Sequence, residues 1–316
     1  MSLTLSSEDN RKVVKFTKMH GIGNDYVYLF DSGTSGADAL PDDLSYLARA
    51  ISDRHCGVGG DGLVVISRCE QPGADFRMRM FNADGSEAQM CGNASRCIGK
   101  YLFEKGYTES TEIRLMTLAG VKVLHLNVKD GKVHSVCVDM GEPVFEAAAI
   151  PARGCNKSSS APWLEEVKVS VKGEELQFAT LSMGNPHAIC FISDAPDDAH
   201  VLGSGPLVEK HEAWPEKVNV EFARVLNRHL IEMRVWERGT GETMACGTGA
   251  CATAVAAISL GLAESPVVIR LSGGDLEISW ERPSGHVLMT GGATTVADGF
   301  YYFDSESDNI WLHPRQ

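Results

Sequence analysis

The sequence predicts an α+β fold of two similar halves, each a set of strands around one central helix. Short β-branched runs separated by turn residues recur along the whole chain, and helix signals are few. Two of the helices also begin alike, because Cys-Gly followed by a polar residue occurs in "MCGNASRC" (90–97) and again in "ACGTGACA" (245–252). These observations together favour a duplicated, strand-rich unit.

Strands are predicted first, from apolar runs bounded by turn residues. They lie at 13–16, 26–30, 62–66, 76–82, 112–116, 121–128, 133–140, 166–171, 176–180, 188–192, 218–225, 231–236, 267–271, 276–280 and 286–290. Helices are predicted at 44–51, at 93–105, where Gly106 closes the segment, and at 247–262. The last helix lies in a run of small residues, 245–263, which is typical of a buried helix rather than a membrane span.

The repeat extends upstream of the two Cys-Gly pairs. A Gly-Asn turn leads into a strand in "HGIGNDYVYLF" and in "SMGNPHAICFI", and these turns are spaced nearly like the cysteines. Two pairs in register predict duplication, with one half at 1–137 and the other at 138–291. The polar, Pro/Ser-rich stretch 142–162 is predicted to be a linker or an exposed loop.

Composition limits the partners of the protein. The chain has 316 residues, 43% of them hydrophobic and 22% charged, and its net charge of −13 argues against binding nucleic acid. We expect a small-molecule partner, no membrane contact and a cytoplasmic location, because the N-terminal residues do not form a signal peptide. Nine cysteines without a secretory signal fit reduced thiols, and the lack of CxxC and HExxH predicts no metal site.

Cys91 and Cys246 are the candidate reactive groups. A helix N-terminus attracts anions and lowers the pKa of a thiol placed there, and its free N–H groups form a seat for a carboxylate. If the halves face each other, one thiolate removes a proton from a carbon while the other thiol returns one on the opposite face. This predicts inversion of an amino acid with no cofactor. The other cysteines are expected to be buried fillers: Cys56, Cys69, Cys97, Cys137, Cys155, Cys190 and Cys251.

Five separated blocks resemble the diaminopimelate epimerase family. They are "KMHGIGNDYV", "FNADGSEAQMCGN", "GNPH", "NVEF" and "ERGTGETMACGTGA", in the family's order. The resemblance implies two pseudo-symmetric halves, each a β-barrel wrapped around a central helix, with the active site in the cleft between them. It also implies that the last segment, 292–316, returns to the first half. The implied activity is the cofactor-independent interconversion of LL- and meso-diaminopimelate.

The resemblance also assigns roles to positions of this chain. It implies catalysis by Cys91 and Cys246, and tuning of their pKa values by His187 and Glu237. The implied substrate-binding positions are Asn24, Asn82, Gly92, Asn93, Asn185, Asn219, Glu237, Arg238, Gly247 and Thr248. Among these, Asn82, Asn219 and Arg238 would serve the distal end of the substrate. The pattern departs from the family at Ala94, where a glycine is usual, and at Gly62, where some relatives have glutamine.

Other functions compete with this hypothesis. A racemase acting on proline, hydroxyproline or histidine would use the same two thiols with a different distal pocket. A phenazine-type isomerase would not need both thiols. A thiol redox sensor would use them to form a disulfide. The oligomeric state is expected to be a homodimer by default, and the extensions 1–11 and 304–316, which carry no motif, are expected to be tails.

Overall fold

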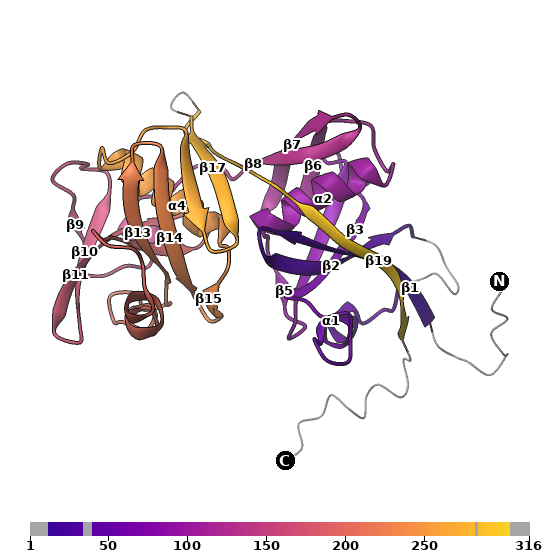
Figure 1. The fold of residues 1–316 in the computed structure, drawn as a ribbon, viewed down its shortest axis with the longest axis horizontal. Helices are drawn as coiled ribbons and strands as arrows, with labels where there is room; N and C mark the ends of the chain where they lie inside the picture. Colours follow the sequence, from indigo (N-terminus) through magenta and orange to yellow (C-terminus); the bar gives the residue numbers. More distant parts are fainter. Residues whose placement is uncertain (1–11, 34–39, 282–283, 304–316) are drawn as a thin grey trace, which may run out of the picture.

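The structure is a computed structural model that describes residues 12–33, 40–281 and 284–303. The chain forms two lobes joined side by side, and it is an α+β fold of two domains (Figure 1). The predicted tails at 1–11 and 304–316 lie outside the described residues. No helix in the described ranges combines the length and the apolar character that crossing a membrane requires.

Within the described residues, the N-terminal half contains eight consecutive strands, two helices and the final strand, β19. These elements are β1 (Lys12–Gly21), β2 (Asn24–Asp31), α1 (Leu44–Ser52), β3 (Gly62–Arg68), β4 (Phe76–Asn82), β5 (Glu87–Ala88), α2 (Gly92–Glu104), β6 (Glu112–Thr117), β7 (Gly120–Lys129), β8 (Lys132–Asp139) and β19 (Thr294–Phe303).

The C-terminal half contains the intervening elements. They are η1 (Ala147–Ala149), β9 (Asn156–Lys157), β10 (Glu165–Val171), β11 (Glu174–Ser182), β12 (Pro186–Phe191), η2 (Ala199–Ser204), α3 (Gly205–Glu209), β13 (Asn219–Asn227), β14 (Leu230–Glu237), β15 (Gly241–Thr243), α4 (Gly247–Ser259), β16 (Val267–Leu271), β17 (Gly274–Trp280) and β18 (Val287–Gly291).

The strand pairings repeat between the halves, as the sequence repeat predicts. In the first half β1–β2 is antiparallel, β2–β3 is parallel, β3–β4 is antiparallel and β4–β6 is parallel. In the second half β11–β12, β12–β13, β13–β14 and β14–β16 pair in the same order and the same senses. Each half ends in an antiparallel meander, β6–β7–β8 or β16–β17–β18. Helices α2 and α4 therefore occupy equivalent places.

Each central helix is enclosed by the strands of its own half. Helix α2 packs against β1, β2, β7 and β8, and α4 packs against β11, β12, β13, β16, β17 and β18. Most of α4 is buried, and its Ala, Gly, Thr and Cys side chains let the strands approach closely. The prediction of a buried helix at 247–262 is confirmed, although the helix ends at Ser259.

Every strand predicted from the sequence overlaps an observed one. The pattern missed β19 and the short strands β5, β9 and β15. Among the described residues strand β19 pairs only with β1, so that it is an edge strand there, and most of its side chains are exposed on both faces. Its residue Asp298 accepts hydrogen bonds from Thr17 Oγ1 and Lys105 Nζ, both at 2.6 Å. The domain boundary at 137/138 falls within β8 and stays a prediction.

The two halves touch closely at two turns. Gly273, between β16 and β17, packs against the backbone of Ile22 in the β1–β2 turn. A Cβ atom at position 273 would lie 1.9 Å from the Ile22 carbonyl oxygen. Strand β18 also pairs with β8 across the halves. The position of the first half against the second thus depends on a backbone contact that admits no side chain at residue 273.

We predict that Gly273→Ala lowers the midpoint of thermal unfolding, because the new methyl group must displace the Ile22 backbone. The cost of such overpacking is about 1–3 kcal/mol. Gly292→Ala is the matched control, since its Cβ would meet no atom within 4 Å. An unchanged midpoint in Gly273→Ala would show that the halves do not pack as described.

Candidate active site

Both candidate cysteines are the N-cap residues of the central helices. Cys91 precedes α2 and Cys246 precedes α4, each with an extended backbone. Cys91 Sγ accepts a hydrogen bond from the Ala94 N–H at 3.5 Å, and Cys246 Sγ accepts one from the Gly249 N–H at 3.4 Å. The sulfur atoms therefore take the place that a serine or aspartate oxygen usually takes at a helix start. Ala94 in place of glycine is compatible with this geometry, because it is helical.

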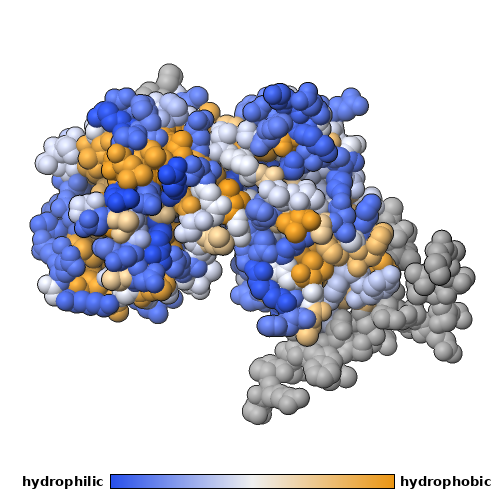
Figure 2. Space-filling view, viewed as in Figure 1, coloured by the Kyte–Doolittle hydropathy of each residue, from blue (hydrophilic) through white to orange (hydrophobic). Residues whose placement is uncertain are grey.

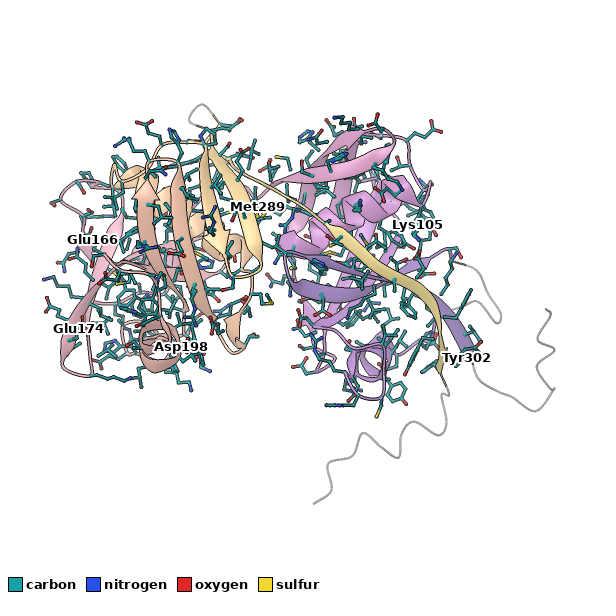
Figure 3. All side chains as sticks on the ribbon, viewed as in Figure 1. Lys105, Glu166, Glu174, Asp198, Met289 and Tyr302 are labelled. Atoms are coloured by element: carbon teal, nitrogen blue, oxygen red, sulfur yellow. The ribbon has the colours of Figure 1, made fainter. Side chains whose placement is uncertain are left out.

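The starts of the two helices are joined directly. Asn93, the second residue of α2, donates its Nδ2–H to the carbonyl oxygen of Ala245 at 3.0 Å, immediately before Cys246. A Cβ atom at Gly92 would lie 2.6 Å from Met289 Cε, and one at Gly247 would lie 3.0 Å from Met289 Sδ. Met289 projects from the inner margin of the C-terminal half toward the other half (Figure 3). The fold thus brings together the predicted backbone positions Gly92, Asn93, Gly247 and Thr248.

Asn24 lies beside the first thiol. Its Oδ1 is 3.5 Å from Cys91 Sγ, and its Nδ2 donates to Asp61 Oδ2 at 2.8 Å. Asp61 also accepts from the backbone N–H of Asp25. Sequence reasoning missed Asp61, whose only signal is its place in the Gly-rich segment "GVGGDG". This carboxylate holds Asn24 in one orientation.

His187 is fully buried on β12 and is bonded to neither thiol. Its Nδ1 lies 2.7 Å from Glu221 Oε1, and its Nε2 lies 2.9 Å from Asn185 Oδ1. Glu221, on β13, is also fully buried. Sequence reasoning quoted Glu221 within "NVEF" but gave it no role. The three side chains form a chain of polar contacts that runs from the half-buried Asn185 to the start of α4, where Glu221 packs against Gly249.

Glu237 is the nearest predicted tuning group of Cys246. It accepts a hydrogen bond from Thr243 Oγ1 and interacts with the Cys246 thiol. Burial raises the pKa of Glu237, and the hydrogen bond from Thr243 partly offsets that rise. The negative charge of Glu237 in turn contributes to raising the pKa of Cys246 and of Cys91. One carboxylate thus acts on both thiols.

The expected lowering of the thiol pKa values is wrong. Burial raises the pKa of Cys91, and it raises the pKa of Cys246 well above its usual value. The backbone N–H groups at both helix starts do lower the two pKa values, but burial outweighs them. Both sulfurs are therefore held mainly as thiols near neutral pH.

The groups predicted for the distal end lie on three separate segments. Asn219 accepts from the Arg238 backbone N–H at 2.9 Å, and its Nδ2 donates to the Pro186 carbonyl at 2.9 Å. Arg238 is exposed, and its Nη1 lies 3.4 Å from the Glu216 carbonyl. Asn82 lies at the end of β4 in the other half and donates to Ser86 Oγ at 3.0 Å. The structure therefore contains no direct bond between Asn82 and the other two.

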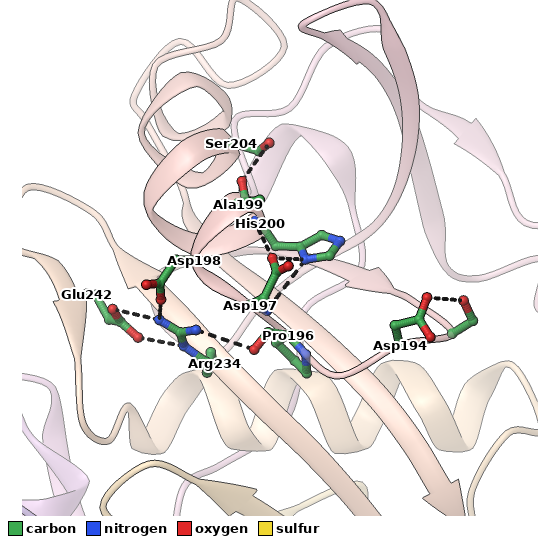
Figure 4. Close-up of polar contacts among 10 residues, drawn as sticks. Asp194, Pro196, Asp197, Asp198, Ala199, His200, Ser204, Arg234 and Glu242 are labelled. Carbon is green, nitrogen blue, oxygen red and sulfur yellow. Dashed lines mark hydrogen bonds and ion pairs between the residues drawn. The ribbon is translucent and has the colours of Figure 1, made fainter.

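The turn that carries Arg238 is held by a buried carboxylate. Glu209 accepts from the Gly239 N–H at 3.0 Å and from Trp236 Nε1 at 2.9 Å. Strand β15 is fixed by Arg234, which bonds Glu242 on β15 and Asp198 near η2 (Figure 4). Neither support was predicted, because both depend on residues brought together from distant segments.

Two further sequence predictions have outcomes here. Cys97, Cys190 and Cys251 are buried as predicted, whereas Cys69, Cys137 and Cys155 are half-buried. Cys56 is exposed, which contradicts the prediction, because it lies in the turn after α1 where its N–H bonds to Asp53.

Gly62 has no room for a side chain, since a Cβ atom would lie 2.0 Å from the Phe81 carbonyl. No cluster of three or more potential metal ligands occurs within the described ranges.

Comparison with known proteins gives close relatives over nearly the whole chain. The diaminopimelate epimerase family profile matches residues 16–146 and 179–296. The chain is 46% identical over 286 residues to a diaminopimelate epimerase of Acetivibrio thermocellus, covering 90% of this chain and 98% of the relative. It is 48% identical over 290 residues to that of Desulfovibrio desulfuricans, covering 92% and 98%.

Solved structures of more distant proteins share the fold. A hydroxyproline epimerase from Agrobacterium vitis has a TM-score of 0.64 at 16% identity, covering 94% of this chain and 93% of that one. A Bacillus anthracis phenazine biosynthesis protein of the PhzF family has a TM-score of 0.65 at 16% identity, covering 92% and 99%. Figure 2 shows the two lobes that this fold places next to each other.

We predict that iodoacetamide at about pH 8 alkylates Cys56 at least tenfold faster than Cys246. The thiolate is the reactive form, and the raised pKa of the buried Cys246 keeps its thiolate fraction small. The Cys246 rate should keep rising as the pH rises beyond about 9. Peptide mass spectrometry measures both rates, and the two should converge in denaturant. Equal rates in the folded protein would contradict the burial of Cys246.

Proposed function

The chain belongs to the diaminopimelate epimerase family, and we propose that it interconverts LL- and meso-2,6-diaminopimelate by proton transfer between Cys91 and Cys246. Family membership makes the chain an isomerase that serves lysine and peptidoglycan precursor synthesis. The observation that supports the two-thiol mechanism is the pair of N-cap cysteines on helix starts joined by the Asn93–Ala245 hydrogen bond.

The substrate is bound by its reacting carboxylate between the two helix starts. The N–H groups of Gly92 and Asn93 face it from α2, and those of Gly247 and Thr248 face it from α4. Removal of the α-proton moves charge onto this carboxylate, and fixed N–H dipoles stabilise that charge most in the transition state. The helix starts thus perform both binding and activation.

The proton is exchanged between two sulfurs. The cysteine on one face, as a thiolate, takes the α-proton and becomes a thiol. The cysteine on the opposite face, as a thiol, gives its proton to the carbanion and becomes a thiolate. The stereocentre is inverted, no electrons leave the system, and the two sulfurs have exchanged roles. No step of this mechanism uses a cofactor or a metal.

Because the pKa values of both thiols are raised, the mechanism needs a base that removes a proton from one of them. One thiol has to lose its proton before the reaction begins, and Glu237 beside Cys246 is the proposed acceptor. Its own pKa is raised by burial, so that its carboxylate is a stronger base than an ordinary glutamate. His187 is proposed to act indirectly, through Asn185 and Glu221.

The distal end of the substrate distinguishes the proposed function from its main alternative. Arg238, Asn219 and Asn82 are proposed to bind the non-reacting amino-acid end. A racemase for proline, hydroxyproline or histidine would use the same thiols without a second charged end to bind. Shared fold at 16% identity does not favour that alternative, whereas the relatives at 46–48% identity favour the epimerase. The relatives at 46–48% identity also favour the epimerase over a thiol redox sensor.

A cytoplasmic location and a homodimer remain predictions. The small-molecule partner proposed here is the amino-acid substrate itself.

We predict that Cys91→Ser and Cys246→Ser each lower kcat by about 10²–10⁴-fold, because a hydroxyl is a far weaker acid than a thiol. The assay incubates the reduced protein with LL-diaminopimelate in deuterium oxide and follows α-deuterium by NMR and the meso isomer by chiral chromatography. Cys56→Ser, a change at an exposed thiol, should retain activity. Full activity in either active-site variant would exclude the two-thiol mechanism, and no exchange by the wild type would exclude the substrate.

We predict that Arg238→Met raises KM for diaminopimelate by about 10–100-fold with a smaller effect on kcat. The reason is the loss of a charged hydrogen-bond donor to the non-reacting end, which is worth about 1.5–3 kcal/mol. Arg270→Met is the control, since Arg270 is an exposed arginine paired with Asp275 on the far side of β16 from this turn. Equal KM values for the two variants would place the distal end elsewhere.

A further inference from the structure

Arg96 is a fully buried arginine that has no carboxylate partner among the described residues. It lies in α2, about one turn beyond Cys91, and is 0% exposed. Its Nε donates to the Gly292 carbonyl at 3.1 Å, and its Nη1 donates to Met289 Sδ at 3.7 Å. Its Nη2 lacks a hydrogen-bond partner within the described ranges. Because arginine does not lose its proton in proteins, a positive charge lies in the interior without an ion pair in that part of the chain.

The guanidinium lies where the two halves meet. A Cβ atom at Gly21, the last residue of β1, would lie 3.1 Å from Arg96 Nη2, and one at Gly291, the last residue of β18, would lie 3.0 Å from its Nε. Met289, which the same guanidinium contacts, lies against the starts of both central helices. A charge removed from water acts on its neighbours more strongly than an exposed one. Arg96 is therefore placed to act on the groups at the helix starts.

The sequence repeat has a neutral side chain at the equivalent position of the second half. Arg96 follows Cys91 by five residues in "MCGNASRC", and Cys251 follows Cys246 by five residues in "ACGTGACA". Cys251 is also 0% exposed, and burial raises its pKa to about 12, so that it is uncharged near neutral pH. The duplicated unit thus has a buried cation behind the first thiol and a neutral group behind the second.

The groups that face Arg96 are weak acids rather than carboxylates. They are Cys91 and Cys97 from the start of α2, Tyr28 from β2 and Cys251 from α4. Cys91 differs from the other three because its sulfur accepts a backbone N–H at the helix start. Such N–H groups and the positive end of the helix dipole stabilise a thiolate. The thiolate of Cys91 is therefore the counter-charge that best fits Arg96.

The two reacting sulfurs face unlike charges. Cys246 faces Glu237 and Glu221, and both carboxylates raise its pKa. Cys91 also faces Glu237, but Arg96 acts in the opposite direction and lowers the pKa of Cys91. The other titratable groups that face Cys91 have pKa values raised by burial and are neutral; they are Tyr26 and Tyr28 from β2 and Cys97 from α2. The same negative charge therefore costs less free energy on Cys91 than on Cys246.

We propose that Arg96 is a positioning residue that holds the negative charge of the thiol pair on Cys91 in preference to Cys246. This inference rests on the proposed function, in which the two sulfurs alternate between thiolate and thiol. In one state of that cycle the charge lies on Cys91, near Arg96. In the other state it lies on Cys246, next to Glu237. The two states thus differ in free energy although both sulfurs cap their helices in the same way.

The first test reads the ionisation of each sulfur without using activity. The reduced full chain is treated with iodoacetamide over a range of pH, and peptide mass spectrometry measures the alkylation rates of Cys91 and Cys246. In the wild type, the Cys91 rate should begin to rise at a lower pH than the Cys246 rate. The opposite order overturns the proposal, even if no Arg96 variant folds.

The second test removes the charge. Arg96→Met should lower the alkylation rate of Cys91 at about pH 8 by about tenfold, which is the change in thiolate fraction when a pKa rises by about one. The Cys246 rate should change less. A purely structural role of Arg96 predicts the opposite sign, because looser packing exposes both sulfurs and raises both rates. An unchanged or higher Cys91 rate in Arg96→Met therefore overturns the proposal.

Two further variants isolate the charge from the contacts. Arg114→Met makes the same change at an exposed arginine of the same half, which is paired with Asp75, and it should leave both rates unchanged. Arg96→Lys keeps a positive charge but loses the shape of the guanidinium, and it should restore most of the Cys91 rate. If Arg96→Lys alkylates Cys91 as slowly as Arg96→Met does, the charge is not the cause and the proposal is wrong.

The outcomes separate this inference from the proposed function. We expect Arg96→Met to lower kcat/KM for LL-diaminopimelate by about tenfold, since every turnover passes through the Cys91 thiolate, and Arg114→Met to retain activity. If the wild type does not act on diaminopimelate, the proposed function fails, while the alkylation rates still decide the role of Arg96. If the wild type is active but Cys91 is alkylated equally fast in Arg96→Met and Arg114→Met, the role of Arg96 is wrong and the epimerase function stands.

Discussion

The site depends on one hydrogen bond, from the Asn93 side chain to the carbonyl of Ala245. It joins the N-termini of α2 and α4, which belong to different halves of the chain. The positive ends of the two helix dipoles repel each other where the helix starts meet. A direct hydrogen bond between the helices opposes this repulsion, and an anion placed there would neutralise the positive ends. The glycines at 92 and 247 allow this approach, because a side chain at either would collide with Met289. The two helix starts together therefore favour an anion at the place where they meet.

Burial and helix dipoles act against each other on the two thiols. The N–H groups at the helix starts favour thiolates, whereas removal from water favours thiols, and removal from water prevails. A resting thiol is protected from oxidation, which proceeds through the thiolate. Burial therefore makes both sulfurs less reactive than exposed thiols.

The sequence was informative where chemistry is local. The cysteines, glycines and Gly-Asn turns follow from short motifs, and the repeat in those motifs predicts the repeat in strand pairing. Residues that act across the fold were not predictable. Asp61, Glu209 and Glu221 support the site through partners far along the chain, and the short motifs around Asp61 and Glu221 do not reveal those partners. Strand β19 was missed because its exposed faces carry no alternating pattern. The thiol pKa direction failed for the same reason, since burial is a tertiary property.

The return of β19 to β1 has a consequence for the order in which the protein is made. The first half cannot complete its sheet until residues 294–303 have left the ribosome, although its other strands end at Asp139. The second half contains all of its strands between β9 and β18 and can fold earlier. During synthesis β1 is an unpaired edge, open to pairing with other chains. The half that begins first is therefore the half that finishes last, and nascent chains are most exposed to misassembly at their N-terminal strand.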